Sequence, residues 1–265
     1  MGASDQPRRS AAASVLLFVS IGLLTGFLSG LFGVGGGVVI VPLLVLLLGF
    51  DQRRAAGTSL AAIVPSAAVG VVSYALSDAV AWIPALILAA GAVLGAQFGT
   101  WLLPRVSQTA LRWAFVGFLL AVIVSLFVVI PSRDVQLTLL WPAVIGLVVL
   151  GLATGTVSGL LGVGGGIIVV PALILVFGTS DLLAKGTSLL MMIPAAISGT
   201  VGNIIRRNID PLGAVCVGLA ACTTTALGAW VATSIDPFTA NILFAVFLAF
   251  IATQMALKAV RGRRR

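Results

Sequence analysis

Long apolar stretches, separated by short polar breaks, follow one another along the whole chain. The apolar runs cover residues 14–32, 38–50, 57–77, 80–102, 110–130, 138–160, 167–178, 186–204, 211–232 and 238–258. Most of them match the roughly 20 residues that an α-helix needs to cross a bilayer. The breaks carry turn residues or charges, as at 51–54, 131–134 and 206–208. The pattern predicts an all-α integral membrane protein with up to ten membrane segments.

Composition supports a membrane location, because only 8% of the 265 residues are charged and 60% are hydrophobic. Soluble domains carry about 25% charged residues, and a chain with this few cannot cover a water-facing surface. The net charge of +8 would suit nucleic-acid binding, but the basic residues occur in short clusters between apolar runs, which is typical of membrane anchoring. We therefore expect residues 1–265 to form a single transmembrane domain in the lipid bilayer, with no nucleic-acid partner.

The distribution of Lys and Arg predicts the orientation of the chain. If every run crosses the membrane and the N-terminus is cytoplasmic, all but two of the 15 basic residues lie on the cytoplasmic side. The exceptions are Arg133 and Lys185. Cytoplasmic segments of membrane proteins carry an excess of Lys and Arg, so both termini are expected in the cytoplasm. Lys185 is expected at the surface, with its stem along apolar residues and its amine in water.

One glycine-rich decapeptide occurs twice, as GVGGGVVIVP at 33–42 and as GVGGGIIVVP at 162–171. When residues 29–70 are aligned with 158–199, an offset of 129 without gaps, 21 of the 42 positions are identical. Such self-similarity indicates a duplicated unit. The spaced glycines before each motif, at positions 22, 26 and 30 and at 151, 155 and 159, correspond under the same offset and are expected to serve close helix packing.

The two halves, residues 1–130 and 131–265, hold five apolar runs each. Because five is odd, the second half enters the membrane from the opposite side. The sequence thus predicts two inverted repeats related by a pseudo-two-fold axis in the membrane plane. Inverted repeats recur in secondary transporters, whose substrate site lies at the repeat interface.

The run after each glycine motif is too short for a full crossing. Residues 38–50 number 13 and reach about 20 Å as a helix, against a hydrocarbon core of about 30 Å. The equivalent run, 167–178, is one residue shorter. The glycine stretches should therefore lie inside the membrane. If these hairpins are re-entrant, the chain has eight spans and the inversion of the halves is preserved.

A glycine-rich break inside a membrane suits a binding site. Non-helical backbone is tolerated there only when it is buried in protein or lines a cavity. Glycine accepts positive φ and lets a ligand approach the backbone. Each stretch also opens a helix, whose first amides lack internal partners and attract a small anion. The substrate-binding candidates are Gly33, Gly35, Gly36, Gly37, Gly162, Gly164, Gly165 and Gly166. The alternative is that these glycines serve only packing or hairpin geometry.

Paired polar residues supply further candidates. Gly57-Thr58-Ser59 and Gly186-Thr187-Ser188 each start an apolar run, where hydroxyls either cap the helix or donate to a bound oxyanion. The candidate hydroxyls are those of Thr58, Ser59, Thr187 and Ser188. Gln97 and Asn203 are second choices for lining a pore, the alternative being that they bond neighbouring helices.

The residue types that are missing limit the chemistry. The chain has no His and no Glu, and its seven Asp residues fall at the ends of the apolar runs or between them. Proton- and cation-coupled carriers often use a carboxylate or a histidine inside the membrane, so a cation pathway is disfavoured. No catalytic constellation is present. We expect no enzymatic activity, no cofactor and no metal site.

The doubled GxGGG-x4-P element, followed in each half by Gly-Thr-Ser, resembles the sulfite exporter TauE/SafE family, also called the toluene-sulfonate uptake permease family. The resemblance extends over nearly the whole chain, because both halves carry the motif. It implies a bacterial- or archaeal-type permease of the plasma (inner) membrane for small sulfur-containing anions such as sulfite or organosulfonates. It does not identify substrate-binding residues.

The leading hypothesis is a permease that exports such an anion by alternating access around a site at the repeat interface. Two alternatives remain open: a permease for another solute, such as a carboxylate or a metal cation, and a non-transporting membrane scaffold. The sequence is compatible with a homo-oligomer as well as with a monomer.

Overall fold

The computed structural model describes residues 11–128 and 141–262, and ten α-helices occupy these ranges. They are α1 (Ala11–Phe32), α2 (Gly37–Leu47), α3 (Gln52–Ala75), α4 (Trp82–Leu102), α5 (Gln108–Val128), α6 (Trp141–Leu161), α7 (Gly166–Leu175), α8 (Asp181–Ile205), α9 (Pro211–Ser234) and α10 (Pro237–Gly262), with a short 3-10 turn, η1 (Leu103–Arg105), after α4. No strand occurs in these ranges, so the predicted all-α fold is confirmed there. The predicted break at 131–134, with Arg133 and the boundary between the halves, lies outside the described residues.

Helix length separates two classes of segment. Six helices, α1, α3, α4, α6, α8 and α9, are long and apolar enough to cross a membrane. By contrast, α2 has 11 residues and α7 has 10, about half of what a crossing needs. The prediction that the runs after the glycine motifs are too short to span is confirmed, and the chain is a multi-pass membrane protein.

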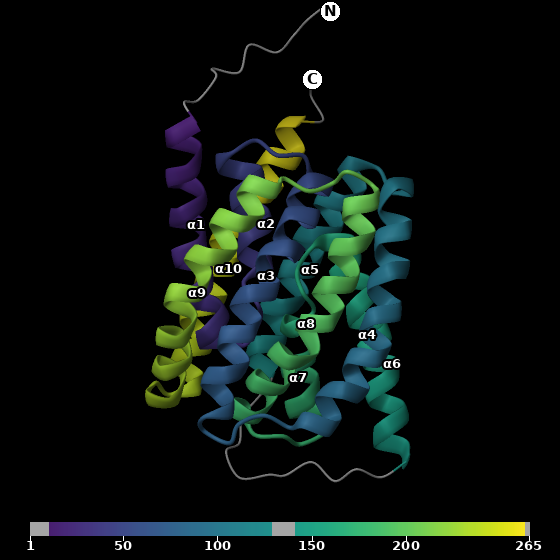
Figure 1. The fold of residues 1–265 in the computed structure, drawn as a ribbon, viewed down its shortest axis with the longest axis vertical. Coiled ribbons are helices and arrows are strands. Elements are labelled where there is room, and N and C mark those ends of the chain that lie inside the picture. Colours follow the sequence, from purple (N-terminus) through teal and green to yellow (C-terminus); the bar gives the residue numbers. More distant parts are fainter. Residues whose placement is uncertain (1–10, 129–140, 263–265) are drawn as a thin grey trace, which may run out of the picture.

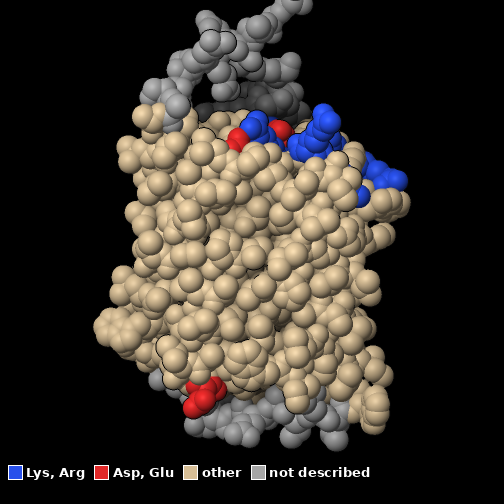
Figure 2. Space-filling view, in the orientation of Figure 1, with Lys and Arg blue, Asp and Glu red and all other residues tan. Residues whose placement is uncertain are grey.

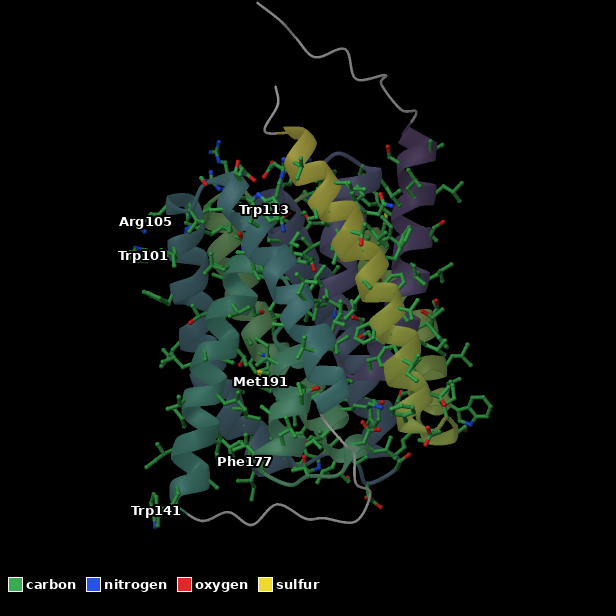
Figure 3. The ribbon with its side chains drawn as sticks, turned by 180° about the vertical axis from the view of Figure 1, so that it is seen from behind. Trp101, Arg105, Trp113, Trp141, Phe177 and Met191 are labelled. Atoms are coloured by element: carbon green, nitrogen blue, oxygen red, sulfur yellow. The ribbon has the colours of Figure 1, made fainter. Side chains whose placement is uncertain are left out.

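The outer surface has the character of a lipid-facing one. Figure 2 shows a broad band without charges between the two ends of the molecule, with Lys and Arg gathered at one end of this face. Trp101 and Trp113 lie toward that end, and Trp141 lies at the other (Figure 3). The Arg105 guanidinium stands 3.6 Å from the centre of the Trp101 ring. Tryptophan and arginine in such belts are typical of membrane–water interfaces.

The helices of the two halves interlock. The most extensive packing joins α1 to α9 and α4 to α6, so each first helix lies against the fourth helix of the other half. Exchanging the halves (α1 with α6, α2 with α7, and so on) converts each of these pairings into the other. It also converts α3·α9 into α4·α8, and leaves α3·α8 and α5·α10 unchanged. The outer ends of α1 and α10 lie at the same end of the bundle, whereas α6 begins at the opposite end (Figure 1).

Glycines let these long helices touch backbone to backbone. A Cβ added to Gly26 of α1 would overlap the Ala221 carbonyl oxygen on α9, and one added to Gly155 of α6 would overlap the Ala92 carbonyl oxygen on α4. The two contacts correspond, because Gly26 and Gly155 are 129 residues apart, as are Ala92 and Ala221. The expected packing role of the spaced glycines is confirmed.

We predict that Gly26→Ala lowers the melting temperature of the purified protein, because the added methyl group separates α1 from α9. Overpacking of this kind costs about 1–3 kcal/mol. Gly117→Ala is the matched control, since a Cβ there would meet nothing within 4 Å. Thermal unfolding in detergent measures both variants. An equal melting temperature for Gly26→Ala and the wild type would contradict the close α1–α9 contact.

Candidate functional site

The two glycine motifs form breaks between helices. Residues 33–36 separate α1 from α2, and residues 162–165 separate α6 from α7. Six glycines of the two motifs have left-handed φ: Gly33 (68°), Gly35 (70°), Gly36 (74°), Gly162 (75°), Gly164 (86°) and Gly165 (89°). Other residues rarely adopt this conformation, which explains why each motif is so rich in glycine. We call residues 33–37 the first glycine loop and residues 162–166 the second glycine loop.

The two loops lie against each other inside the protein. A Cβ added to Gly37 would stand 2.7 Å from the carbonyl oxygens of Gly162 and Val163. One added to Gly166 would stand 2.7 Å from the carbonyl oxygen of Gly33. Every residue of both loops is buried. From this meeting point α2 and α7 run toward opposite ends of the bundle (Figure 1), so their N-terminal, partially positive ends both face the centre.

Consecutive backbone amides in both loops have no partner. Among the described residues, the five amides from Val34 to Val38 donate to no protein acceptor, and neither do the five from Val163 to Ile167. Internal helix bonds begin only at Val39, whose amide donates to the Gly36 carbonyl at 2.9 Å. Buried amides are rarely left unpaired in proteins. Two equivalent sets of free donors therefore converge on one region.

The carbonyl groups at the beginning of each loop are, in contrast, occupied. Ser59 Oγ on α3 donates to the Gly162 carbonyl at 2.7 Å, and Ser188 Oγ on α8 donates to the Gly33 carbonyl at 2.6 Å. Each bond joins one half to the loop of the other. The two serine hydroxyls thus hold the loops in place instead of turning their protons toward a ligand. The loops present more donors than acceptors to their surroundings.

The threonines and glycines of the same motifs join the halves near the two ends of the bundle. Thr58 Oγ1 accepts from the amide of Asp210 at 2.9 Å, and Thr187 Oγ1 accepts from the amide of Ala81 at 3.0 Å. A Cβ on the preceding glycine, 57 or 186, would overlap the carbonyl of residue 208 or 79. We call these contacts the α3 clasp (57–58 with 208–210) and the α8 clasp (186–187 with 79–81).

Of the two roles considered for these motifs, helix capping is wrong. Helix α3 begins at Gln52, where the Asp51 side chain accepts from the amides of residues 53 and 54. Helix α8 begins at Asp181, where Ser180 Oγ accepts from the Leu183 amide at 3.3 Å. The Gly-Thr-Ser motifs therefore lie inside their helices, nearly two turns beyond the true caps.

The two amide side chains proposed as pore-lining residues bond to nearby backbone. Gln97 Nε2 on α4 donates to the Ser198 carbonyl on α8 at 2.8 Å. Asn203 Nδ2 donates to the Gly199 carbonyl at 2.9 Å, and Asn203 Oδ1 accepts from Asn208 Nδ2 at 3.3 Å. Neither side chain forms a hydrogen bond to a glycine loop. Gln97 bonds a neighbouring helix, as the alternative expects, whereas Asn203 bonds within its own helix α8 and to Asn208 just beyond it.

Lys185 is not at the surface, so that expectation is wrong. Its side chain is only 7% exposed, and its Nζ lies 2.8 Å from Asp181 Oδ2, one turn earlier on α8. The stem of Lys185 packs on the first glycine loop, where a Cβ on Gly33 would lie 2.6 Å from Lys185 Cα. At the equivalent positions the first half has Ala56 and Gln52. The two halves therefore differ in charge directly beside the loops.

Sequence reasoning missed three residues near the loops. A Cβ on Gly35 or on Gly164 would overlap the terminal methyl group of Met192, which therefore lies between the two loops. Ser29 and Ser158, in the last turns of α1 and α6, are fully buried, and neither hydroxyl has a hydrogen-bond partner. The identity of these serines in the repeat alignment was the available signal.

The chain matches the family model of the sulfite exporter TauE/SafE family over residues 2–126 and 147–265. It is similar to the probable membrane transporter protein YunE of Bacillus subtilis, with 24% identity over 93% of this chain and 99% of the relative. A probable membrane transporter protein of Haemophilus influenzae is 30% identical over 92% of this chain and 98% of the relative. Another, from Xylella fastidiosa, is 32% identical over 74% of each chain. No solved structure matches the chain significantly.

We predict that Ser59→Ala and Ser188→Ala lower the melting temperature by similar amounts, because each leaves a buried carbonyl without its side-chain donor. An unpaired buried group costs about 1–3 kcal/mol. Ser66→Ala is the control, since Ser66 Oγ bonds only within its own helix, to Ile63, and the second half has Ala195 at this position. If both loop-bonding variants melt like Ser66→Ala, these serines do not secure the loops.

A second prediction concerns the buried ion pair between Lys185 and Asp181. Lys185→Ala leaves the Asp181 carboxylate buried without its partner, which typically destabilises a protein by about 3–5 kcal/mol. The double variant Asp181→Gln, Lys185→Ala installs the residues of the first half and should recover most of the lost stability. Thermal unfolding of the single and double variants checks this. Equal losses in both would show that the charge of Asp181 is not the cause.

Proposed function

Because the chain belongs to the sulfite exporter TauE/SafE family of membrane transporters, we propose that it is a plasma-membrane permease that exports a small sulfur-containing oxyanion, sulfite or an organosulfonate. The observation that carries this proposal is the pair of buried glycine loops with consecutive unpaired amides. Sulfite and sulfonate groups present several oxygens that accept hydrogen bonds. Helix N-termini with free amides are established sites for such anions.

The balance of donors and acceptors favours an anion over a metal cation. Cations require oxygen, nitrogen or sulfur ligands, whereas the unpaired backbone groups of the two loops are mostly amide donors and the carbonyls of Gly33 and Gly162 already accept from serines. Asp181 is the one buried carboxylate among the described residues, and it is paired with Lys185. The described residues also contain no group of three His, Cys, Asp or Glu side chains that could hold a metal ion.

Reciprocal contacts support the inverted-repeat architecture. The two loops, the two clasps and the α1·α9 and α4·α6 packing all correspond under the offset of 129 residues. The basic end of the molecule contains the outer ends of α1 and α10 (Figures 1 and 2). The positive-inside rule assigns this end to the cytoplasm.

In the proposed transport cycle, the two clasps open alternately. The α3 clasp closes the cytoplasmic end, where an ion pair between Arg54 and Asp210 adds to it. The α8 clasp closes the opposite end. Both clasps are intact in this structure and both loops are buried, an arrangement that corresponds to an occluded form. Opening one clasp at a time would expose the loop amides to one side of the membrane and then to the other.

Two alternatives have distinct tests. A carboxylate also accepts hydrogen bonds, so a carboxylate permease would use the same loops. A membrane scaffold would move no solute. Flux of sulfite, methanesulfonate, acetate and a divalent metal ion into proteoliposomes distinguishes a sulfur-oxyanion permease from a carboxylate permease, a metal-cation permease and a scaffold. Uptake of acetate without sulfite or sulfonate would refute the substrate class, and uptake of none by the purified protein would support the scaffold.

We predict that Gly36→Ala and Gly165→Ala each reduce sulfite flux at least tenfold, because a side chain at these positive φ angles shifts the loop amides. Losing one hydrogen bond to a charged ligand typically weakens binding by about tenfold or more. Gly49→Ala is the matched control, since Gly49 has nearly the same φ (72° against 74° for Gly36) but lies exposed after α2. Undiminished flux in folded Gly36→Ala and Gly165→Ala proteins would exclude the loops as the binding site.

A further inference from the structure

Two buried serine hydroxyls remain without partners beside the glycine loops. Ser29 and Ser158 are both 0% exposed, and neither hydroxyl has a hydrogen-bond partner. Their backbone carbonyls accept from the first glycine of each loop, Gly33 at 2.9 Å and Gly162 at 2.7 Å. Among the buried unpartnered side chains of the described residues, these two form the one pair related by the repeat offset. Occurrence in both halves argues against an accident of local packing.

The hydroxyls of these serines form no hydrogen bond within their own helices. A serine or threonine inside a helix has a nearby acceptor in the carbonyl four residues earlier. Thr25 and Thr154, one turn before the serines, do so, to the carbonyls of Ile21 at 2.8 Å and Leu150 at 2.7 Å. Ser29 and Ser158 forgo this local partner, which leaves their protons for another acceptor.

The same serines lie on the sides of α1 and α6 that adjoin the free amides. A Cβ on Gly36 would stand 3.0 Å from the Thr25 carbonyl oxygen, and one on Gly165 would stand 3.4 Å from the Thr154 carbonyl oxygen. Residues four apart share a helix face. Each serine is therefore one turn closer to its loop, on the threonine face that the loop glycine approaches.

We infer that Ser29 and Ser158 are substrate-binding residues, whose hydroxyls donate to the oxygens of the transported oxyanion together with the loop amides. The inference rests on the proposed function of these loops. It replaces Ser59 and Ser188 as side-chain donors, because their protons already go to the loop carbonyls. The oxygens of Thr58 and Thr187 accept backbone amides in the two clasps, which is the role assigned to them here. The oxygens of an oxyanion would accept from these unpaired hydroxyls and amides together.

The test compares stability and affinity in Ser29→Ala and Ser158→Ala. Removing an unpartnered buried hydroxyl should leave the melting temperature of the ligand-free protein unchanged or raise it, since the desolvated group disappears. The same change should weaken binding of sulfite and methanesulfonate about tenfold or more, measured by calorimetry and by ligand-induced thermal shift. Ser66→Ala, which removes a buried hydroxyl of α3, should leave both affinities unchanged.

The changes in ligand-free melting temperature and in anion affinity together distinguish a structural role of the serines from a binding role. A lower ligand-free melting temperature with unchanged affinity would mean that the serines are structural and would overturn the inference. Binding that Gly36→Ala abolishes but both serine variants retain would overturn the inference while preserving the loops as the site. Absence of binding of either anion to the wild type would refute the proposed function itself. Ser29→Cys and Ser158→Cys, which preserve shape but donate weakly, repeat the comparison if either alanine variant does not fold.

Discussion

Non-helical backbone inside a membrane has to be enclosed by protein, because lipid offers no partners to its amides and carbonyls. The architecture of this chain follows from meeting that condition twice in one place. Glycines at positive φ separate α1 from α2 and α6 from α7, and the two glycine loops that result pack against each other. Long helices from both halves surround them, with α1 against α9 and α4 against α6 in backbone contact. Serines from α3 and α8 satisfy the first carbonyl of each loop, and the unpaired backbone groups that remain in the two loops are mostly amide donors.

Correspondence between the halves makes their differences informative. The loops, the serine bonds and the threonine clasps occur in both halves, whereas the ion pairs near them differ between the halves. At one end Arg54 joins α3 to Asp210 across the halves. At the other end Lys185 pairs with Asp181 within a single helix and so bridges nothing. A cross-link that spans the halves must break when its end opens, while an intrahelical pair can move with α8. The two ends of the proposed pathway therefore differ in the interactions that opening disrupts.

Features that depend on the length of an apolar run or on the conformational preferences of local residues could be predicted from the sequence. A 13-residue apolar run cannot cross a bilayer, and a cluster of glycines breaks a helix wherever it lies. Features that depend on partners distant in the chain could not. The Gly-Thr-Ser motifs resembled helix starts because arginines precede the first of them, yet the Asp51 carboxylate extends α3 across those arginines. Lys185 resembled a surface lysine because a buried charge needs a partner, and that partner, Asp181, was assigned to a break between runs although it stands one helical turn away. The hydroxyls of Ser29 and Ser158 are distinguished by having no hydrogen-bond partner, which the sequence does not show.

A transporter has to release its substrate as well as bind it, and the charge arrangement at the loops suits this requirement. A buried lysine without a counter-ion would hold an anion strongly and would itself be costly to bury. Pairing Lys185 with Asp181 makes the local net charge zero, so attraction for the proposed anion would come from the dipoles of amides and hydroxyls. Such donors are spread over two loops that belong to different halves. Relative movement of the halves would then separate the donors from one another and weaken binding without any change of protonation, which couples substrate release directly to the opening of a clasp.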